Sequence, residues 1–317
     1  MPTTTAVGVL LPRDLPAALF RDYAVRAERL GFDELWVVED CFFRGGIAQA
    51  ATALAATERL RVGIGILPAA VRSPAFTALE TGTLAELFPG RVDIGIGHGV
   101  PEWMRQVGVW PKHPLRVLET TLQTVRALLR GERVDLDTEE YTLTGVQLES
   151  PPAVVPLVLA GVRGPRSLAA AGRSADGTVL AEPVTPEYLA AALAQIDAPG
   201  PHRVVTYNVC AVDDDADAAR RAVRPALEWI GEPGWAPHVA PLPFAAEFAA
   251  LRSSVTSRAE FGQRLPDTWV DQLSVVGTPE LARARIAELH AAGATSVVLA
   301  PCGPDPLAAM ESVARVL

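Results

Sequence analysis

Apolar segments typical of buried strands return along this chain about every 30 residues, and a helical segment follows most of them. Four strands are expected to start near residues 6, 34, 61 and 91, with helices at 16–30, 47–56, 74–87 and 114–129. Later strands are expected at 154–159, 178–181, 204–212 and 296–300, with helices at 165–172, 186–194 and 304–316. Helical connections make successive strands parallel. Eight such units predict an α/β chain folded as a (β/α)₈ TIM barrel rather than an open sheet.

Two segments interrupt this rhythm. Residues 131–153 contain an alternating run at 141–148 that predicts a small hairpin. Residues 231–277 are long and rich in proline and aromatic side chains, and we expect them to cover one end of the barrel. The sequence shows no convincing linker, so we expect a single domain over 1–317 with insertions at about 131–153 and 231–277.

Composition excludes several classes of protein. The net charge of −9 argues against binding to nucleic acid or to an anionic membrane surface. No apolar run reaches the roughly 18 residues of a membrane span, and the first six residues do not resemble a signal peptide. The three cysteines form no CxxC pair and the histidines no HExxH motif, so we expect neither a disulfide framework nor a metal site. A cytoplasmic enzyme acting on a small molecule is the default expectation.

The third strand carries two glycines, Gly63 and Gly65, within a buried apolar run that ends at Leu67. Glycine weakens a strand, so it needs a reason there. Either a flat ligand or another backbone approaches closely, or small residues fit a crowded barrel interior. The residues alone leave both interpretations open.

Active sites of such barrels lie where the strands end. Glu39, Asp40 and Cys41 end the second strand, where a carboxylate would carry a proton or accept a hydrogen bond from a ring N–H. Because neighbouring strand residues alternate in direction, only one of Glu39 and Asp40 is expected to face the mouth. The alternative is a helix cap or an ion pair with an arginine. No base lies nearby in sequence to make Cys41 a nucleophile.

Gly97, His98 and Gly99 end the fourth strand, where flanking glycines let the backbone approach a ligand and place an imidazole at the mouth. A tight turn with a solvated histidine is the alternative. The fifth strand leads into Gly161–Ser167, and Gly177–Thr178 follow in the next strand. Backbone N–H groups at a helix start, with arginines such as Arg163, suit a phosphate group, although an ordinary turn fits the same residues.

Several segments in the same order resemble the bacterial luciferase-like flavin-dependent oxidoreductases, and most closely the F420-dependent branch that includes methylenetetrahydromethanopterin reductase. They are AERLGFDELWV (27–37), RVGIGI (61–66), VRSP (71–74), FPGRVDIGIG (88–97), PLVLAG (156–161), AGRSADG (171–177) and VGTPE (276–280). The resemblance covers nearly the whole chain. It implies a luciferase-like TIM barrel with insertions, commonly a homodimer, with a flavin-type ring over the strand ends.

The resemblance also implies site residues. A non-prolyl cis peptide would fall at Gly65–Ile66 or Ile66–Leu67, behind the ring. The cofactor phosphate would lie on the amides of Gly161, Val162 and Arg163, near Gly177 and Thr178. Glu39, Asp40 and His98 would line the ring or the substrate, with Gly99 beside them. The chain departs from relatives that have an Asp-His pair where it has Asp40-Cys41, and Leu67-Pro68-Ala69-Ala70 make the pocket apolar.

The expected activity is hydride transfer between coenzyme F420 and a small organic substrate. FMN is the alternative cofactor; it would permit oxygen activation by a monooxygenase fed by a separate flavin reductase. A homologue without cofactor that serves as a dimer partner is a second alternative. A phosphate-binding aldolase or isomerase is a further alternative that would use a Schiff-base lysine or a carboxylate base at a strand end. The only lysine, Lys112, lies in a loop beyond the fourth strand, which disfavours the Schiff-base version.

Overall fold

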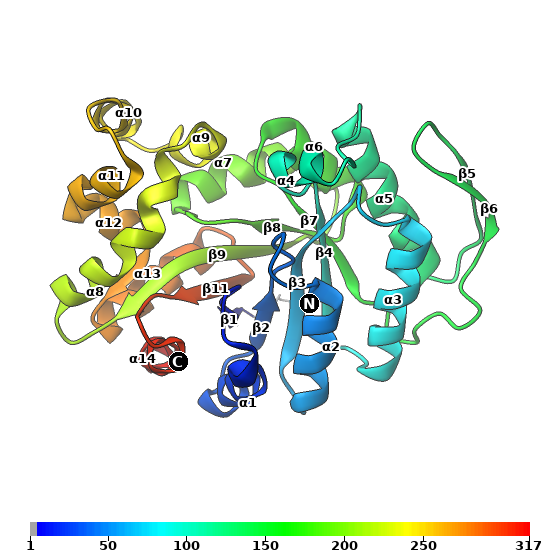
Figure 1. The fold of residues 1–317 in the computed structure, drawn as a ribbon, viewed down its shortest axis with the longest axis horizontal. Coiled ribbons are helices and arrows are strands. Elements are labelled where there is room, and N and C mark those ends of the chain that lie inside the picture. Colours follow the sequence, from blue (N-terminus) through cyan, green and yellow to red (C-terminus); the bar gives the residue numbers. More distant parts are fainter. Residues whose placement is uncertain (1–4) are drawn as a thin grey trace.

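The computed structural model describes residues 5–317, and it confirms the predicted (β/α)₈ barrel (Figure 1). Eight parallel strands follow one another around it: β1 (Ala6–Leu10), β2 (Glu34–Val37), β3 (Arg61–Pro68), β4 (Val92–Gly97), β7 (Leu157–Gly161), β8 (Gly177–Leu180), β9 (Arg203–Val212) and β11 (Ser296–Pro301). The ring closes where β8 pairs with β9 and β11 pairs with β1. A short strand, β10 (Val275–Gly277), pairs with the carboxyl half of β9. The signal-peptide expectation falls mainly on residues 1–4, which lie outside the described residues.

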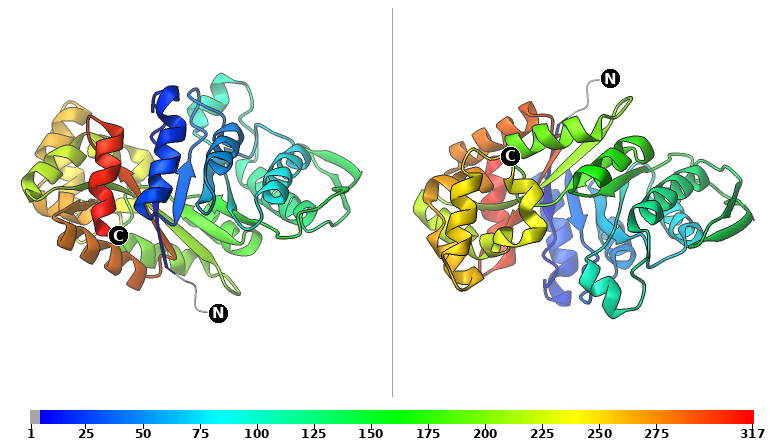
Figure 2. Two further views of the ribbon diagram at one scale, coloured as in Figure 1. Left: turned by 90° about the horizontal axis from the view of Figure 1, so that it is seen from below. Right: turned by 90° about the horizontal axis from the view of Figure 1, so that it is seen from above.

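Helices surround the barrel (Figures 1 and 2). Those that follow the first six strands are α1 (Phe20–Leu30), α2 (Gly46–Ala56), α3 (Pro74–Leu87), α4 (Pro101–Gln106), α5 (Pro114–Leu129), α6 (Pro165–Ser174) and α7 (Pro186–Ile196). Later in the chain come α8 (Ala216–Val223), α13 (Pro279–Ala291) and α14 (Pro306–Val313). Proline at a first helical position costs no hydrogen bond, which is why the predicted starts at 74, 114, 165 and 186 are met.

Two segments extend from the barrel on opposite sides of the molecule (Figure 1). The first is an antiparallel hairpin of β5 (Val134–Asp137) and β6 (Thr142–Val146), so the predicted run at 141–148 supplies only its second strand. The second lies between β9 and β10 and contains α9 (Ala236–Val239), α10 (Ala245–Ser253), α11 (Arg258–Arg264) and α12 (Asp267–Leu273). It has its own apolar cluster, in which Phe244 stacks on Trp269. We call residues 224–273 the helical insertion.

The interior of the barrel is apolar in its middle layer and ionic at its amino end. The apolar layer is formed by Trp36, Leu159, Val179, Val205, Tyr207 and Val298. At the amino end, Arg203 pairs with Glu34 and lies 3.2 Å from Asp93, and both carboxylates are buried. Glu34 also accepts hydrogen bonds from Trp36 Nε1 (2.8 Å) and Ser296 Oγ (2.7 Å). This network, called the plug below, closes one end of the barrel, so any ligand must enter at the carboxyl ends of the strands.

In the part of the chain from residue 5 onward, none of the helices is long and apolar enough to cross a membrane.

Candidate functional site

Strand β3 bulges at the mouth of the barrel. The Gly65–Ile66 peptide bond is cis, at the first of the two predicted positions, and the pairing of β3 with β4 shifts register between Ile64 and Leu67. The bulge turns Ile66 toward β4 and β7. Leu67, predicted to contact the cofactor, instead buries its side chain against the start of α2, close to Gly46.

Three glycines make room for Ile66. A Cβ at Gly95 or Gly97 would lie 3.1 Å from Ile66 side-chain atoms, and one at Gly161 would overlap Ile66 Cγ2. Ile66 therefore lies across two neighbouring strands, on a surface without side chains of its own. This explains the glycines of the fourth and fifth barrel strands, and it gives the mouth a flat apolar floor.

Tyr207 of β9 lies directly beside this bulge, and sequence reasoning missed it. A Cβ at Gly65 would overlap the Tyr207 hydroxyl, so Gly65 is required by a close approach from the far side of the barrel. The hydroxyl is buried and has no hydrogen-bond partner among the described residues. Burial raises the pKa of Tyr207, so the group remains a donor. Trp36 meets the same ring edge-on at 5.8 Å.

Glu39, predicted as a catalytic group, is fully engaged. Its carboxylate accepts from both Nη atoms of Arg72 (2.6 and 2.8 Å) and from the backbone N–H of Gly46 (2.7 Å) at the start of α2. These bonds tie the loop after β3 to the end of β2. Glu39 therefore forms the ion pair with an arginine that the alternative interpretation named.

Asp40 remains at the mouth with one partner. Arg13, from the loop after β1, donates to its Oδ2 at 3.0 Å and lies over the ring of Phe43 at 4.9 Å. Burial, with the charges of Glu39 and Asp40, raises the pKa of Cys41, which agrees with the expectation that Cys41 is not a nucleophile. The Cys41–Phe42 bond is also cis, and Phe42 is exposed.

His98 bridges the first turns of two helices. Its Nε2 lies 3.0 Å from the Ser167 hydroxyl in α6, and a second hydrogen bond reaches the backbone of Pro114 in α5. Burial lowers the pKa of His98, with the Pro114 bond acting in the opposite direction, so the imidazole is neutral near pH 7. Gly99 turns the chain with φ +72° and packs against Met104. The predicted position of His98 at a strand end is met, but both ring contacts are structural.

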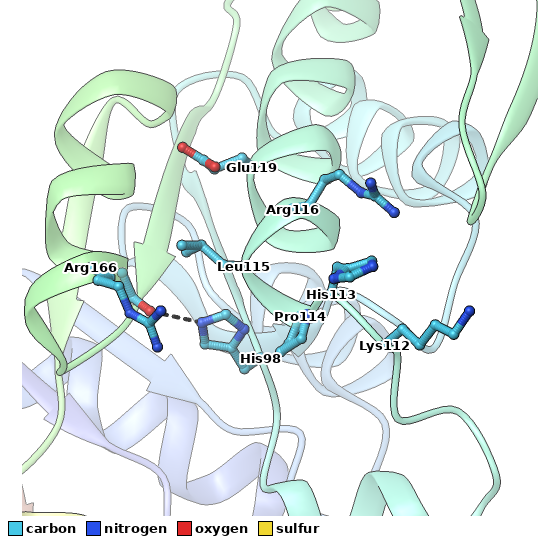
Figure 3. A pocket seen from close by; sticks show the side chains of 9 residues that line it. His98, Lys112, His113, Pro114, Leu115, Arg116, Glu119 and Arg166 are labelled. Carbon is cyan, nitrogen blue, oxygen red and sulfur yellow. Dashed lines mark hydrogen bonds between the residues drawn. The ribbon is translucent and has the colours of Figure 1, made fainter.

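A cavity of about 490 Å³ opens beside His98 (Figure 3). It is lined by the first turns of α5 and α6 and by the preceding loop: His98, Lys112, His113, Pro114, Leu115, Arg116, Glu119, Arg166 and Ser167. Neither helix has a side-chain cap at its start. The backbone N–H groups of Arg166 and Ser167 thus lack partners within α6, an arrangement that suits an anion.

The residues that were predicted to bind the phosphate do not all face the cavity. Arg163 points away from the cavity: its guanidinium stacks over Trp235 (4.9 Å) and donates to the carbonyl of Gly234 (3.2 Å). The Val162 side chain is buried, and its N–H donates to the carbonyl of Val179 (3.4 Å). Arg166 and Ser167, which end the predicted Gly161–Ser167 segment but were not among the residues assigned to the phosphate, occupy the first turn instead. Their signal was the proline at 165, which fixes where the helix begins.

Gly177 and Thr178 were predicted to lie near the cofactor phosphate, beside the turn at Gly161. The structure places them elsewhere. Both lie at the amino end of β8, because the strand begins at Gly177, whereas the Gly161 turn follows the carboxyl end of β7. The Thr178 hydroxyl lies 2.8 Å from His202 Nε2, outside the barrel. A Cβ at Gly177 would overlap the backbone of Arg203, so this glycine is required by close strand packing.

Glu182, at the carboxyl end of β8, is a further acid that sequence reasoning did not select. It precedes cis-Pro183, and the helical insertion holds both carbonyls: Trp235 Nε1 donates to Glu182 (3.1 Å), and His238 Nδ1 lies 2.9 Å from the oxygen of Pro183. Burial raises the pKa of Glu182, with the charges of Arg163 and Asp40 nearby. A raised pKa at a strand end is a feature of active sites.

Within residues 5–317, no group of three or more His, Cys, Asp or Glu side chains is placed to hold a metal ion. The mouth instead combines an apolar floor at Ile66, polar groups at its rim and an uncapped helix start at one side. This arrangement suits a planar molecule with an anionic tail more than a metal or a covalent intermediate.

Together, the closed barrel and its bulged mouth define the chain as a (β/α)₈ barrel of the kind that holds a planar ligand over its strand ends. The model of the luciferase-like monooxygenase family matches residues 3–296, and the chain belongs to this family.

Individual relatives narrow the comparison. The chain is 30% identical to the 5,10-methylenetetrahydromethanopterin reductase of Archaeoglobus fulgidus over 312 residues, which cover 92% of each protein. The structure of the coenzyme F420 dependent tetrahydromethanopterin reductase from Methanopyrus kandleri superposes with a TM-score of 0.83 at 22% identity, covering 99% of this chain and 98% of that one. The oxygenating constituent of 3,6-diketocamphane monooxygenase from Pseudomonas putida, in complex with FMN, gives a TM-score of 0.74 at 16% identity, covering 99% and 96%.

Proposed function

We propose that this chain is an oxidoreductase that binds coenzyme F420 at the mouth of its barrel and transfers hydride between the deazaflavin and a small organic substrate. The observation that carries the proposal is the Ile66 floor, supported by glycines of β4 and β7, with a buried unpartnered hydroxyl from Tyr207 beside it. A flat apolar floor with a single polar atom suits one face of a planar ring. One of the named structural relatives is a coenzyme F420 dependent reductase.

The residues present fit the cofactor in two parts. The ring would lie on Ile66 at the strand ends, where Asp40 and Gly97 also lie. The phosphate would lie on the free N–H groups of Arg166 and Ser167 at the start of α6, with the Arg166 side chain as counter-charge. When bound, the deazaflavin supplies a two-electron hydride donor or acceptor.

The chain's own residues orient and enclose the reactants. Asp40, held by Arg13, would accept a hydrogen bond or a proton at the ring edge or the substrate. Glu39 acts as a positioning residue through Arg72, and His98 keeps the two helix starts in place. Leu67, Pro68 and Ala69 are buried and exclude water from the wall beside the floor.

Cofactor titration tests the proposal. Purified protein is titrated with F420 and, separately, with FMN, and binding is measured by calorimetry and by the change in cofactor absorbance. Tight binding of F420 and weak binding of FMN is the expected result. Tighter binding of FMN than of F420 would instead support the alternative function, a monooxygenase that activates oxygen and receives reduced flavin from a separate reductase. Binding of neither would leave the alternative of a homologue without cofactor.

We further propose that two copies of the chain associate through α2 and α3. α2 contains no charged residue, and the outer side of α3 exposes Phe76 (64%), Leu79 (50%) and Leu87 (65%). A helix that is apolar on its solvent side as well as its core side needs a second partner. Light scattering should give a dimer for the native chain and a monomer for Leu79→Glu, with Leu281→Glu as the exposed-leucine control. A native monomer would refute the assignment.

The chain is proposed to be a single cytoplasmic domain in which the hairpin and the helical insertion extend the barrel. Support comes from the acidic composition and from contacts that tie the insertion to β8 through Trp235 and His238. Limited proteolysis is the direct test, since a single domain should resist cleavage near residues 131–153 and 231–277 until it unfolds.

A further inference from the structure

The cavity beside His98 contains more cationic groups than a single phosphate needs. Lys112 and Arg116 lie on its α5 side and Arg166 on its α6 side (Figure 3). Two uncapped helix starts meet there, so backbone N–H groups of Leu115 and Arg116 join those of Arg166 and Ser167. The only acid in the lining, Glu119, is paired with Arg173 at 2.7 Å. The cavity is therefore suited to several negative charges.

Part of this positive charge is already neutralised by another segment of the chain. Glu139 accepts from Lys112 (3.0 Å) and from Arg116 (3.2 Å), and Glu140 accepts from Arg116 (2.8 Å). Both acids lie in the turn between β5 and β6, the tip of the hairpin. The two acids thus place carboxylates where an anionic ligand would place its own.

The tip is held in this position from both sides. The Tyr141 hydroxyl donates to the carbonyl of Ala69 (3.0 Å), and Thr138 and Tyr141 close the turn through a backbone bond of 2.9 Å. The Lys112–Glu139 pair is exposed, with Lys112 at 78% and Glu139 at 51%, whereas Glu140 is more buried at 15%. Exposed pairs contribute little free energy, so a ligand carboxylate can replace Glu139 at small cost.

We propose that this cavity binds the glutamyl carboxylates of the F420 tail through Lys112 and Arg116, and that Glu139 and Glu140 compete with the tail for the same two cations. The proposal rests on the proposed function, because it assumes F420 at the mouth. It adds the subsite that would select F420 over FMN: the F420 tail continues past its phosphate into glutamyl carboxylates, whereas FMN ends at its phosphate.

The test compares ligands with and without the phosphate and the glutamyl tail. The native chain and three variants are titrated by calorimetry with F420 carrying several glutamates, with the deazaflavin chromophore lacking phosphate and tail, and with FMN. Lys112→Gln/Arg116→Gln removes the cations, and Glu139→Gln/Glu140→Gln removes the competing carboxylates. Arg283→Gln is the matched control, since Arg283 forms an equally exposed pair with Glu280 on α13.

Opposite signs are expected from the two double variants. Loss of Lys112 and Arg116 should raise the Kd for F420 about tenfold and leave the chromophore within about twofold. Loss of the tip carboxylates should lower the Kd for F420 about threefold, again without effect on the chromophore. The control should leave every ligand unchanged, and added salt should shrink both effects.

Two results would overturn the proposal. If the native chain binds the chromophore as tightly as F420, or if Glu139→Gln/Glu140→Gln weakens F420, the subsite is wrong while the proposed function stands. If the native chain binds no deazaflavin at all, both proposals fail together.

Discussion

The two ends of the barrel use charge in opposite ways. At the plug, Glu34 and Asp93 are almost completely buried and share Arg203. At the mouth, Asp40 and its partner Arg13 have side chains 30% and 48% exposed. Removing a buried charge leaves its partner desolvated, whereas water replaces an exposed partner easily. The plug therefore contributes to holding the fold together, and the mouth keeps groups that can exchange a protein partner for a ligand.

The same difference separates the glycines. Gly177, near the plug, allows two strands to pack closely, and its neighbour Thr178 is bound to His202. Gly65, Gly97 and Gly161, at the mouth, make room for side chains that form a floor. A glycine in a barrel strand thus has no single meaning; its height along the strand decides whether it is structural or belongs to a site.

Breaking the plug should have the largest effect. Arg203→Met leaves Glu34 buried without its cation and Asp93 with Arg61 alone (3.2 Å), and the free energy of unfolding should fall by about 3–5 kcal/mol. Urea denaturation measures it. Adding Glu34→Gln and Asp93→Asn to the same chain removes the stranded charges and should recover part of the loss. If the free energy of unfolding fell by less than about 1 kcal/mol, the ion pairs of the plug would contribute no more to stability than exposed pairs do.

A buried group at the mouth sharpens the comparison. His238 has a fully buried side chain whose ring lies 4.2 Å from that of Tyr188 at a tilt of 31°, and burial lowers its pKa from 6.5 to about 3. Below pH 6.5 the unfolded chain therefore takes up a proton that the folded chain refuses, so stability is full above pH 6.5 and is lost as the pH falls toward 3. By pH 5 this residue alone should lower the free energy of unfolding by about 2 kcal/mol.

His238→Asn tests that loss, because an amide N–H can still donate to the carbonyl of Pro183. Urea titrations at pH 7.5 and pH 5 should show a smaller pH-dependent loss in the variant by that amount. His98 and His202, whose pKa values burial also lowers, are common to both proteins and cancel. Equal losses in the two proteins would mean that His238 is already charged or solvated in the folded chain.

A change in the floor of the mouth should affect cofactor binding. In Gly161→Ala the new methyl group overlaps Ile66 Cγ2, so Ile66 must move toward the ring position. The Kd for F420 should rise about tenfold, equivalent to 1.4 kcal/mol, measured by calorimetry. Gly200→Ala, which meets no atom within 4 Å, is the control. An unchanged Kd would show that Ile66 does not support the ring.

Local patterns predicted most of the fold. Apolar runs and helix-starting prolines placed all eight barrel strands and the helices at 74–87 and 114–129, because periodicity and proline geometry are local properties. The segment 161–167 was also correctly located at a strand end. What the sequence could not supply was the direction of each side chain.

Three site residues show why the sequence could not predict the direction of each side chain. Glu39 stands at a strand end, but its partner Arg72 comes from the next loop and takes both oxygens. Arg163 and Arg166 differ by one turn of chain, and only the packing of Trp235 decides that Arg163 leaves the cavity. In the sequence, Tyr207 has the pattern of an ordinary buried strand residue. Only the closed barrel brings its hydroxyl against Gly65. Each outcome depends on contacts distant in sequence.

The smallest effect is expected at the exposed pair of the mouth. Arg13→Gln removes the partner of Asp40, but Asp40 can turn to water, so the free energy of unfolding should change by less than about 1 kcal/mol. The same substitution leaves an uncompensated carboxylate at the proposed ring position and should change the Kd for F420. Urea denaturation and calorimetry measure the two effects on one protein. If Arg13→Gln lowered the free energy of unfolding as much as Arg203→Met, Asp40 would behave as a buried charge. The plug and the mouth would then not differ in how strongly their ion pairs affect stability.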